Sequence, residues 1–376
     1  MSTSRNDFDY DYIVVGVGGI GSAAVYWLSR LTPGSQLARE SYQPWHELEA
    51  ECGLQLVYKT GGLFWTTPDT GLSYAAKQYE EAGRAAGART EVLDGNEIRK
   101  RWPQLNVDSS AVGVFDPDAG LVDAAMGIAA HQQCAIARGA KILSNVKVEK
   151  LEKLDGGGMK VVTNHGCFTC RKVIVCSGAW INQVLSSVGL QIPVKVSQEN
   201  VTYLATPYLK DFSKENFPIC LAARKTREFY ILPVHGIAAF KIGIDAEGPG
   251  VTGDTRNFTP DPERERLCIE FLSKYIPKAL GRIVETRTCL YTMTYDRSFV
   301  IDDLSVKNHP DVLVCCGAGH GFKFAALFGR TLAEMAIRGK AQVDISPFCL
   351  NRPAITDPSF KPEFHAIKEQ NIHCKL

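Results

Sequence analysis

Three continuous apolar runs stand out along the chain, at residues 13–15, 173–176 and 312–316. A strand that helices cover on both faces of a parallel sheet reads as such a run, because both of its faces are buried. We therefore predict that the three runs are strands of one parallel sheet, although they lie far apart in the sequence.

Residues 190–288 follow a second pattern, in which apolar and polar side chains alternate over short stretches, at 200–205, 229–233 and 238–244. Alternation of this kind is typical of antiparallel strands with one covered face. Helical spacing and helix-ending residues predict helices near residues 72–86, 96–102 and 124–138.

The two patterns alternate along the chain, so we predict an α/β protein with mixed α+β content and two interleaved domains. The nucleotide-type domain takes residues 1–55, 116–189 and 289–350, the substrate-type domain takes 56–115 and 190–288, and 351–376 form a C-terminal tail. Neither an internal repeat nor a low-complexity linker separates the segments.

The first apolar run leads into a glycine-rich turn and then into an alanine-rich helical stretch. In this order Gly16 allows the tight turn, Gly18 lets a pyrophosphate approach the backbone, and Gly21 lets the helix lie close to the strand. The helix N-terminus then offers free N–H groups to the phosphates. This context predicts a dinucleotide site; a tight turn in an ordinary α/β protein is the alternative.

A dinucleotide site of this type also needs a second strand that ends in an acidic residue about 20 positions further on. Residues 29–41 contain no apolar strand. Glu40 stands at about the right distance, yet it continues into a helical pattern of apolar residues at Tyr42, Trp45, Leu48 and Leu56. We therefore predict that the second strand is absent.

Composition excludes several classes of protein. A net charge of +1 leaves no footprint for nucleic acid, and the chain has neither an 18-residue apolar run nor the apolar core of a signal peptide, so we expect a soluble intracellular protein. Twelve scattered cysteines suit a reducing compartment. Cys167 and Cys170 form a C-x-x-C without a second ligand pair, so we predict no metal site.

The third apolar run ends in Gly317-Ala318-Gly319-His320-Gly321 and opens a helix. Such a loop places backbone N–H groups and Lys323 at the carboxyl edge of the sheet, where ligands bind. Lys323 is then a fixed cation that faces a carboxylate or an anionic cofactor ring. Its neighbours Phe322 and Phe324 predict that it is half-buried; a surface lysine at a helix start is the alternative.

Together, the glycine turn, Cys289-Leu290-Tyr291-Thr292 and Gly319-His320-Gly321-Phe322-Lys323-Phe324 resemble the monomeric sarcosine oxidase family. That family includes N-methyltryptophan oxidase and peroxisomal sarcosine and pipecolate oxidase. The similarity runs from Tyr12 to about Pro353 and includes Arg101-Trp102-Pro103 and Gly178-Ala179-Trp180.

The resemblance implies a Rossmann-like FAD-binding domain of the glutathione-reductase-like oxidase type, interleaved with an antiparallel-sheet substrate domain. It implies an FAD-dependent amine oxidase that takes a hydride from the carbon beside the amine of a secondary or tertiary amino acid, such as sarcosine or pipecolate. Oxygen reoxidises the flavin and hydrogen peroxide is released. The implied protein is a monomer whose partners are its amino acid substrate and O2.

The resemblance also assigns residues by their match to the family motifs. Cys289 is the covalent attachment point of FAD, and Lys241 holds a water near the flavin and assists oxygen. The residues implied in catalysis are Lys241, Lys323, Tyr291 and His320, and those at the substrate are Tyr230, Asp245 and Lys323. Those implied in cofactor binding are Gly16, Gly18, Gly21, Val148, Gly178, Cys289, Gly317, Gly319, Gly321 and Lys323.

The chain departs from the family pattern in two places. Asp245 stands where the family often has a histidine. Family members also carry the second strand and a Ser-x-x-Arg-x-x-x-Arg-like loop that covers the flavin, and both are absent here. A truncated, catalytically impaired member without stable FAD binding is therefore an alternative. A nicotinamide dehydrogenase is a third reading, which leaves Cys289 and the two lysines without a role.

The final residues Cys374-Lys375-Leu376 resemble the S-K-L peroxisomal address. They predict binding to the peroxisomal import receptor and a peroxisomal location, with a cytoplasmic location as the alternative.

Overall fold

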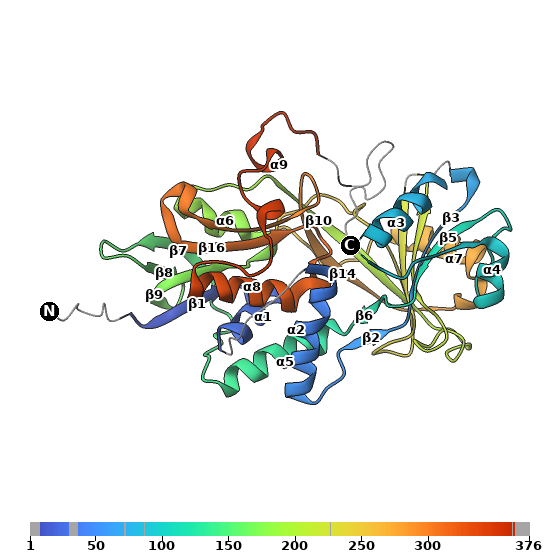
Figure 1. Ribbon diagram of the computed structural model, residues 1–376, viewed down its shortest axis with the longest axis horizontal. Coiled ribbons are helices and arrows are strands. Elements are labelled where there is room, and N and C mark those ends of the chain that lie inside the picture. The colour runs from blue at the N-terminus through green and yellow to red at the C-terminus, as the bar shows by residue number, and fades with distance from the viewer. Residues whose placement is uncertain are drawn as a thin grey trace. The chain divides into compact units, whose positions relative to one another are not determined.

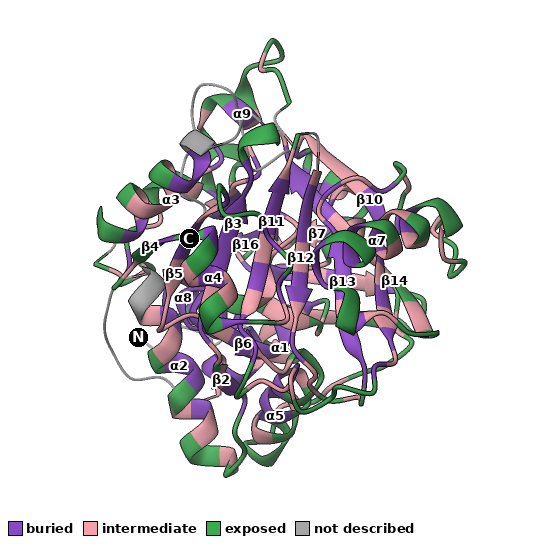
Figure 2. Ribbon diagram, turned by 90° about the vertical axis from the view of Figure 1, so that its right-hand side faces the viewer, coloured by how far each residue is buried: buried purple, intermediate pink, exposed green. Residues whose placement is uncertain are grey.

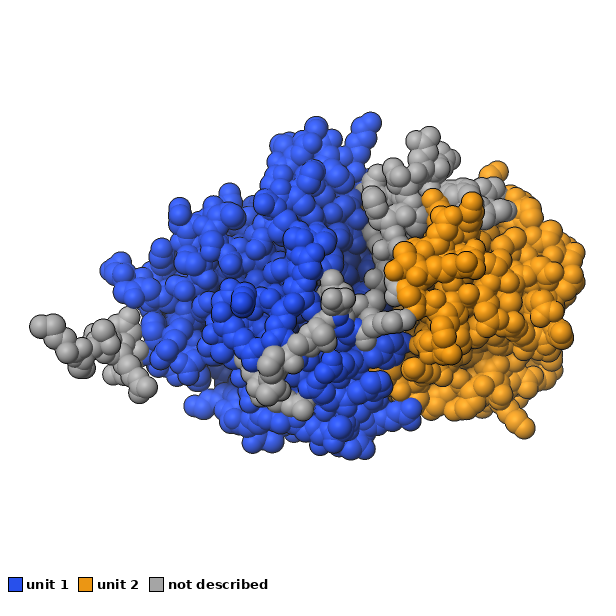
Figure 3. All heavy atoms as spheres, in the orientation of Figure 1, with its two compact units in different colours: residues 1–56, 124–196, 292–363 blue, residues 57–123, 197–291, 364–376 orange. Residues whose placement is uncertain are grey.

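The computed structural model describes residues 8–29, 37–70, 73–85, 87–225, 227–362 and 364. It divides into two compact units (Figure 3): unit 1 comprises residues 1–56, 124–196 and 292–363, and unit 2 comprises 57–123, 197–291 and 364–376. The four boundaries between the units up to residue 291 each lie within eight residues of the one expected from the sequence. Residues 351–362, expected to form a separate C-terminal tail, belong to unit 1. The Cys374-Lys375-Leu376 signal lies outside the described residues.

Unit 1 is built on a six-stranded sheet (Figure 1). Its strands are β1 (Tyr10–Val15), β7 (Val148–Lys153), β8 (Met159–Thr163), β9 (Gly166–Val175), β15 (Phe299–Leu304) and β16 (His309–Gly317). Both β1 and β16 pair with β9 in parallel, and Val175 lies opposite Val15 on one side and Val314 on the other. The predicted parallel neighbours are therefore confirmed.

Helices pack on both faces of this sheet, which explains the continuous apolar runs. The helices of unit 1 are α1 (Gly19–Leu28), α2 (Leu37–Cys52), α5 (Ala124–Ala137), α6 (Ile181–Leu185), α8 (Ala325–Arg338) and α9 (Pro353–Thr356). Buried residues of α1 and α8 pack on Ile174, whereas buried residues of α6 pack on Val173 and Val175. Gly329 lets α8 approach α1 closely, since a Cβ there would lie 2.4 Å from Ala23.

The expected second strand has no counterpart in the described part of the chain between α1 and α2. Residues 37–52 form α2, as the apolar spacing predicts, with Trp45 and Leu48 buried. Glu40 therefore lies in the first turn of a helix and not at the end of a strand. The described pairing of β1 is with β9, and its residues Tyr12, Ile13 and Val14 are only half-buried.

Unit 2 contains an eight-stranded, mostly antiparallel sheet in the order β14-β10-β13-β12-β11-β3-β5-β4. The bounds are β3 (Gly62–Thr66), β4 (Glu91–Asp94), β5 (Val112–Asp116), β10 (Val194–Leu204), β11 (Ile219–Arg224), β12 (Arg227–Leu232), β13 (Phe240–Ile244) and β14 (Ile283–Thr294). Strands β2 (Val57–Lys59) and β6 (Gly120–Val122) form a separate antiparallel pair. The predicted alternating strands are confirmed as members of this sheet.

One face of this sheet forms the core of unit 2. Phe229, Ile231, Phe240 and Ile242 are buried there with Phe271 of α7 (Pro262–Tyr275). Figure 2 shows the strands as a mixture of buried and intermediate residues and the outer side of α7 as exposed. The other helices are α3 (Ser73–Ala85) and α4 (Gly95–Arg101), so the three helices predicted near 72–86, 96–102 and 124–138 are confirmed to within two residues.

The C-x-x-C pair lies on β9 of unit 1. Its members are three positions apart and so point to opposite faces of the strand. Cys170 is buried, and this burial raises the pKa of its thiol to about 12, whereas Cys167 is exposed. Among the described residues no group of three His, Cys, Asp or Glu side chains could hold a metal ion.

Candidate functional site

The glycine turn of unit 1 has the geometry of a phosphate cradle. Gly16 adopts a positive φ of 89°, and a Cβ on Gly21 would lie 1.7 Å from the Gly16 carbonyl oxygen, so the helix packs directly against the turn. A Cβ on Gly18 would meet no atom within 4 Å, and Gly18 is the N-cap of α1. The backbone at Gly18 is therefore open to an anion at a helix N-terminus.

Further glycines lie at the carboxyl ends of the neighbouring strands. Gly178 follows β9 with φ of 51°, and Gly317 and Gly319 end β16 with φ of 105° and 77°. Because β1, β9 and β16 are parallel, these turns meet at the same edge of the sheet as Gly16. Val148, the remaining predicted backbone contact, is the half-buried first residue of β7.

The loop after β16 folds onto the start of α1. A short 3-10 helix (Gly321–Phe324) follows His320, whose half-buried ring contacts Phe299 at 5.4 Å between centroids. The ring of Phe322 lies 2.9 Å from where a Cβ of Gly19 would stand. This loop therefore covers the first residue of α1.

Lys323 is exposed in this turn, so the prediction that it is half-buried is wrong. The 3-10 turn buries Phe324 against the α8 side of the sheet and sends the intervening lysine outward. Its main chain is held nonetheless, since the indole Nε1 of Trp45 donates to the Lys323 carbonyl oxygen at 3.0 Å.

Helix α2 is attached to unit 1 by charge as well as by Trp45. Arg330 of α8 is buried and lies 3.3 Å from carboxylate oxygens of both Glu47 and Glu334. Burial raises the pKa of Glu40, and the positive charge of Arg330 opposes that rise. Glu40 thus lies on a helix that packs against α8, and not at the end of a strand, where a ribose ligand of this type of site is expected.

The predicted residues of unit 2 gather on the face of its sheet opposite the core. Lys241 lies directly across from Tyr203 on one side and Leu232 on the other, while Gly243 lies across from Tyr230. Paired residues of antiparallel strands project to the same face. The ring of Tyr230 extends over Gly243, where a Cβ would lie 2.3 Å from the phenol oxygen.

Cys289 of β14 lies beside β10, the strand next to β13, because its Sγ is 3.9 Å from the main-chain oxygen of Glu199. Burial lowers the pKa of Lys241, and the nearby Cys289 opposes that fall. Burial raises the pKa of the Cys289 thiol, Glu199 raises it further, and Lys241 opposes both. The pKa of Tyr230 lies well above its usual value because of burial, with Tyr291, Cys289 and Asp245 adding to the rise.

Two groups of predicted residues thus exist, one in each unit. Unit 1 contains the glycine turns, Val148, His320 and Lys323, and unit 2 contains Tyr230, Lys241, Asp245, Cys289 and Tyr291. In unit 1 the glycine turns share the carboxyl edge of the sheet, whereas Val148 pairs with Thr163 near the start of β9, away from that edge. In unit 2 Tyr230 and Lys241 lie on one face of the sheet.

Sequence reasoning missed three residues of unit 2. Gly243 interrupts an alternating strand, which is a usual sign of close approach by another group. Glu199 and Arg264 form an ion pair of 2.6 Å inside the unit and gave no signal, because charged residues on a strand and a helix are ordinarily exposed.

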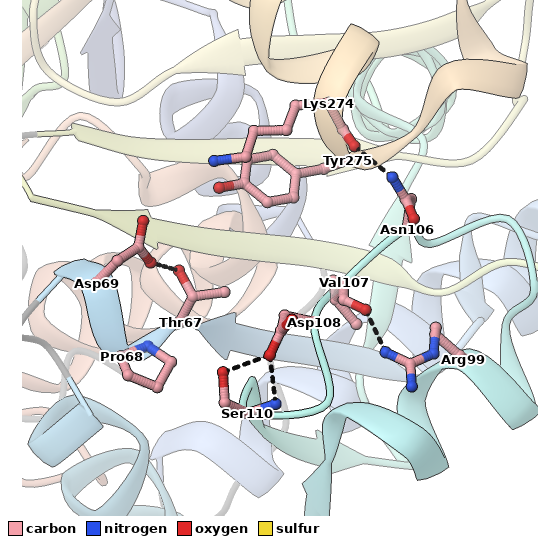
Figure 4. Close-up of a pocket in the computed structure, with 10 residues that line it drawn as sticks. All are labelled: Thr67, Pro68, Asp69, Arg99, Asn106, Val107, Asp108, Ser110, Lys274 and Tyr275. Carbon is pink, nitrogen blue, oxygen red and sulfur yellow. Dashed lines mark hydrogen bonds between the residues drawn. The ribbon is translucent and has the colours of Figure 1, made fainter.

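A pocket of about 600 Å³ lies elsewhere in unit 2 (Figure 4). Its lining contains no predicted site residue and consists of Thr67, Pro68, Asp69, Arg99, Asn106, Val107, Asp108, Ser110, Lys274 and Tyr275. The polar groups largely hold the surrounding loops: Asp108 accepts from the backbone N–H and hydroxyl of Ser110, and Asp69 accepts from Thr67. We assign the pocket a structural role.

Comparison with known proteins gives consistent matches over most of the chain. The family model "FAD dependent oxidoreductase" matches residues 27–335. Monomeric sarcosine oxidase of Bacillus sp. strain B-0618 is 32% identical, with 93% of this chain and 97% of the relative covered. N-methyl-L-tryptophan oxidase of Yersinia pestis (strain Pestoides F) is 26% identical over 92% of this chain and 99% of the relative.

Solved structures share the fold. NikD, described as an unusual amino acid oxidase, superposes with a TM-score of 0.77 at 22% identity, covering 90% of this chain and 96% of NikD. The L-proline dehydrogenase of P. horikoshii gives the same TM-score at 21% identity and the same coverage.

The alignment with the Bacillus relative also shows that this chain is shorter inside the matched region. It spans 384 positions, whereas 93% of 376 residues is about 350, so roughly 34 positions contain no residue of this chain. A deficit of this size is large enough for the strand and the arginine loop that the sequence lacks between α1 and α2.

Proposed function

The chain belongs to the FAD-dependent oxidoreductase family, and from that premise we propose that it oxidises the C–N bond of a secondary or tertiary amino acid such as sarcosine or pipecolate. Oxygen is the proposed acceptor and hydrogen peroxide the proposed product. The observation that supports the proposal is the pairing of β12 with β13, which puts Tyr230 and Lys241 on one face of the unit 2 sheet. Cys289, on β14 of the same sheet, lies 3.9 Å from the main-chain oxygen of Glu199 on β10.

The residues of unit 1 fit the diphosphate part of FAD. The open backbone at Gly18 and the helix-to-turn contact at Gly21 are the features that a pyrophosphate requires. We propose that Val148, Gly178, Gly317, Gly319 and Gly321 add backbone contacts and that Cys289 holds the flavin covalently. The ribose hydroxyls have no acidic partner on a strand following α1 among the described residues.

When bound, FAD supplies the acceptor for a hydride and passes the electrons to oxygen. The chain's own contribution is electrostatic. Lys241 is a largely desolvated cation beside Cys289, and such a cation stabilises negative charge that develops on oxygen. The Tyr230 phenol is protonated at neutral pH, as a tyrosine ordinarily is, and burial raises its pKa further. We propose that its hydroxyl donates a hydrogen bond to the substrate.

In our proposal Lys323 of unit 1 binds the substrate carboxylate, and His320 of the same loop takes part in catalysis. Tyr291 is proposed separately as a catalytic residue of unit 2. Asp245 is half-buried, and its negative charge adds to the rise in the pKa of the Tyr230 phenol. A carboxylate at this position favours substrates with a positive charge near the amine over those selected by a histidine.

Purified protein tests the proposal directly. We expect a yellow protein with about one FAD per chain that releases peroxide with sarcosine or pipecolate. After acid precipitation the flavin should stay with the wild type and with Cys167→Ser, the matched exposed-cysteine control, and leave Cys289→Ser. A colourless protein would contradict the proposal and favour the truncated, non-enzymatic alternative, which the oxidase names of the relatives do not support. Peroxide formation without added nicotinamide excludes a dehydrogenase.

We also propose a peroxisomal location through binding of Cys374-Lys375-Leu376 to the import receptor. No helix of the described residues has the length and apolar character to cross a membrane. Residues 367–376 fused to a fluorescent reporter should give a punctate signal that overlaps a peroxisomal marker. Removal of the last three residues should return it to the cytosol, and a diffuse signal from the intact fusion contradicts this location.

A further inference from the structure

The Glu199–Arg264 ion pair of unit 2 is entirely buried. Glu199 is 0% exposed, and its carboxylate accepts from Arg264 Nη2 at 2.6 Å, from Ser197 Oγ at 2.6 Å and from the backbone N–H of Gly248 at 3.0 Å. A buried carboxylate is tolerated only when it is paired and hydrogen-bonded in this way. The cation and the hydrogen bonds around Glu199 therefore compensate the desolvation of a carboxylate inside unit 2.

The pair connects helix α7 to two strands of the sheet, β10 and β13. Arg264 projects from α7, and its Nη2 also donates to the carbonyl oxygen of Ile244, the last residue of β13, at 3.0 Å. Gly248 packs on β10, since a Cβ there would lie 2.0 Å from the Gln198 oxygen. One ion pair thus fixes α7, β10 and the end of β13 together.

Cys289 lies next to this pair. Its Sγ is 3.9 Å from the main-chain oxygen of Glu199, at a distance that suits a weak thiol hydrogen bond. The Glu199 charge acts on both Cys289 and Tyr230. The charged and titratable groups around Cys289 are Tyr203 and Glu199 of β10, Tyr230 of β12, Lys241 of β13, Arg287 of β14, Arg264 of α7 and Arg256.

We propose that Glu199, held in place by Arg264, is a positioning residue that restrains the reactivity of the Cys289 thiol. Burial is the main cause of the raised pKa of the Cys289 thiol, and the Glu199 carboxylate adds to it against the lowering effects of Lys241, Arg256 and Arg264. The inference rests on the proposed function in one respect, namely that Cys289 is the thiol to which the flavin attaches.

The test measures the alkylation of Cys289 in the full chain, produced under riboflavin limitation so that the thiol is free. Glu199→Gln removes the negative charge and keeps the shape, which lowers the pKa of Cys289. A nearby charge shifts a pKa by about 1–3 units. A lower pKa gives a larger fraction of thiolate at neutral pH but makes each thiolate less nucleophilic. Each unit by which the pKa falls therefore speeds alkylation by iodoacetamide about threefold. We expect an increase of about 3- to 30-fold, read by mass spectrometry of the Cys289 peptide.

Three controls separate charge from loosened structure. Arg264→Lys keeps the cation and should retain the wild-type rate, and Glu263→Gln changes an exposed carboxylate on the same helix and should have no effect. Alkylation of Cys268, buried on α7, should stay unchanged. At a pH above both thiol pKa values Glu199→Gln should no longer react faster than wild type, because both thiols are then fully ionised and the thiolate of lower pKa is the weaker nucleophile.

An unchanged or slower rate in Glu199→Gln at neutral pH overturns the inference. Faster alkylation of Cys268 to the same extent, or an acceleration of Cys289 alkylation that persists at high pH, also overturns it. The flavin-to-protein ratio of wild type grown with riboflavin tests the proposed function separately. A colourless wild type with faster alkylation in Glu199→Gln would reject that function and retain the electrostatic role of Glu199.

Discussion

A drop in pH should destabilise unit 1 through His131. This residue of α5 is 0% exposed, and its ring lies 5.3 Å from Tyr26 and 5.2 Å from Trp45 between centroids. Burial lowers its pKa from 6.5 to about 3. The imidazole is therefore neutral in the folded protein at any pH at which the fold is ordinarily studied.

The sign follows from proton binding. Between pH 6.5 and about 3 the unfolded chain binds a proton at His131 that the folded chain does not, so acidification favours unfolding. The stability associated with neutral His131 is fully present above pH 6.5 and is lost as the pH falls toward about 3. With about 1.4 kcal/mol per unit, the contribution falls by about 2 kcal/mol between pH 7 and pH 5.

Chemical denaturation of wild type and His131→Leu at pH 7 and pH 5 measures this effect. His131→Leu should lose about 2 kcal/mol less stability than wild type over this interval, although its stability at pH 7 will also change through repacking. His46→Leu is the control, because His46 is more than half exposed and pairs with Glu49 at the surface. Equal pH dependence in wild type and His131→Leu would refute the argument.

Three further predictions follow from the same structure. Gly21→Ala should lower the melting temperature by several degrees and abolish FAD binding, because the new Cβ would lie 1.7 Å from a backbone oxygen. Gly18→Ala should keep the wild-type melting temperature and lose only FAD affinity. A wild-type melting temperature for Gly21→Ala would contradict the first expectation. Arg330→Ala should destabilise unit 1 by about 3–5 kcal/mol in denaturant titration, since it leaves two carboxylates without their buried cation; a loss below 1 kcal/mol would count against it. Lys241→Met should slow flavin reoxidation by oxygen at least tenfold in stopped-flow measurements with little effect on flavin reduction, and the exposed Lys225→Met should not.

The sheet of unit 1 could be predicted from the sequence because burial on both faces leaves a continuous apolar run. The same reasoning correctly predicted a helix, and not a strand, over residues 37–52, because their apolar positions have helical spacing. Here the requirement for burial determines both the residue types and their order, so a local pattern is sufficient.

Other features depend on contacts between distant residues, which a local pattern does not contain. The exposure of Lys323 follows from the direction of a 3-10 turn, and the two phenylalanines that flank it suggested the opposite. The Glu199–Arg264 pair joins positions 65 apart in sequence, and each residue alone resembles an ordinary surface charge. The placement of Tyr230 over Gly243 likewise depends on the register of β12 against β13.

The close approach of α8 to α1 at Gly329 has a consequence for how the chain tolerates change. The glycine turn is held from three directions: by β9 through the parallel pairing of β1, by Gln132 of α5, whose amide donates to the Val17 oxygen at 3.0 Å, and by α8. All three supports come from residues beyond position 123. The segment that follows α1 is thus not needed to shape the phosphate end of the fold, and a block of residues can be lost there while the turn keeps its geometry.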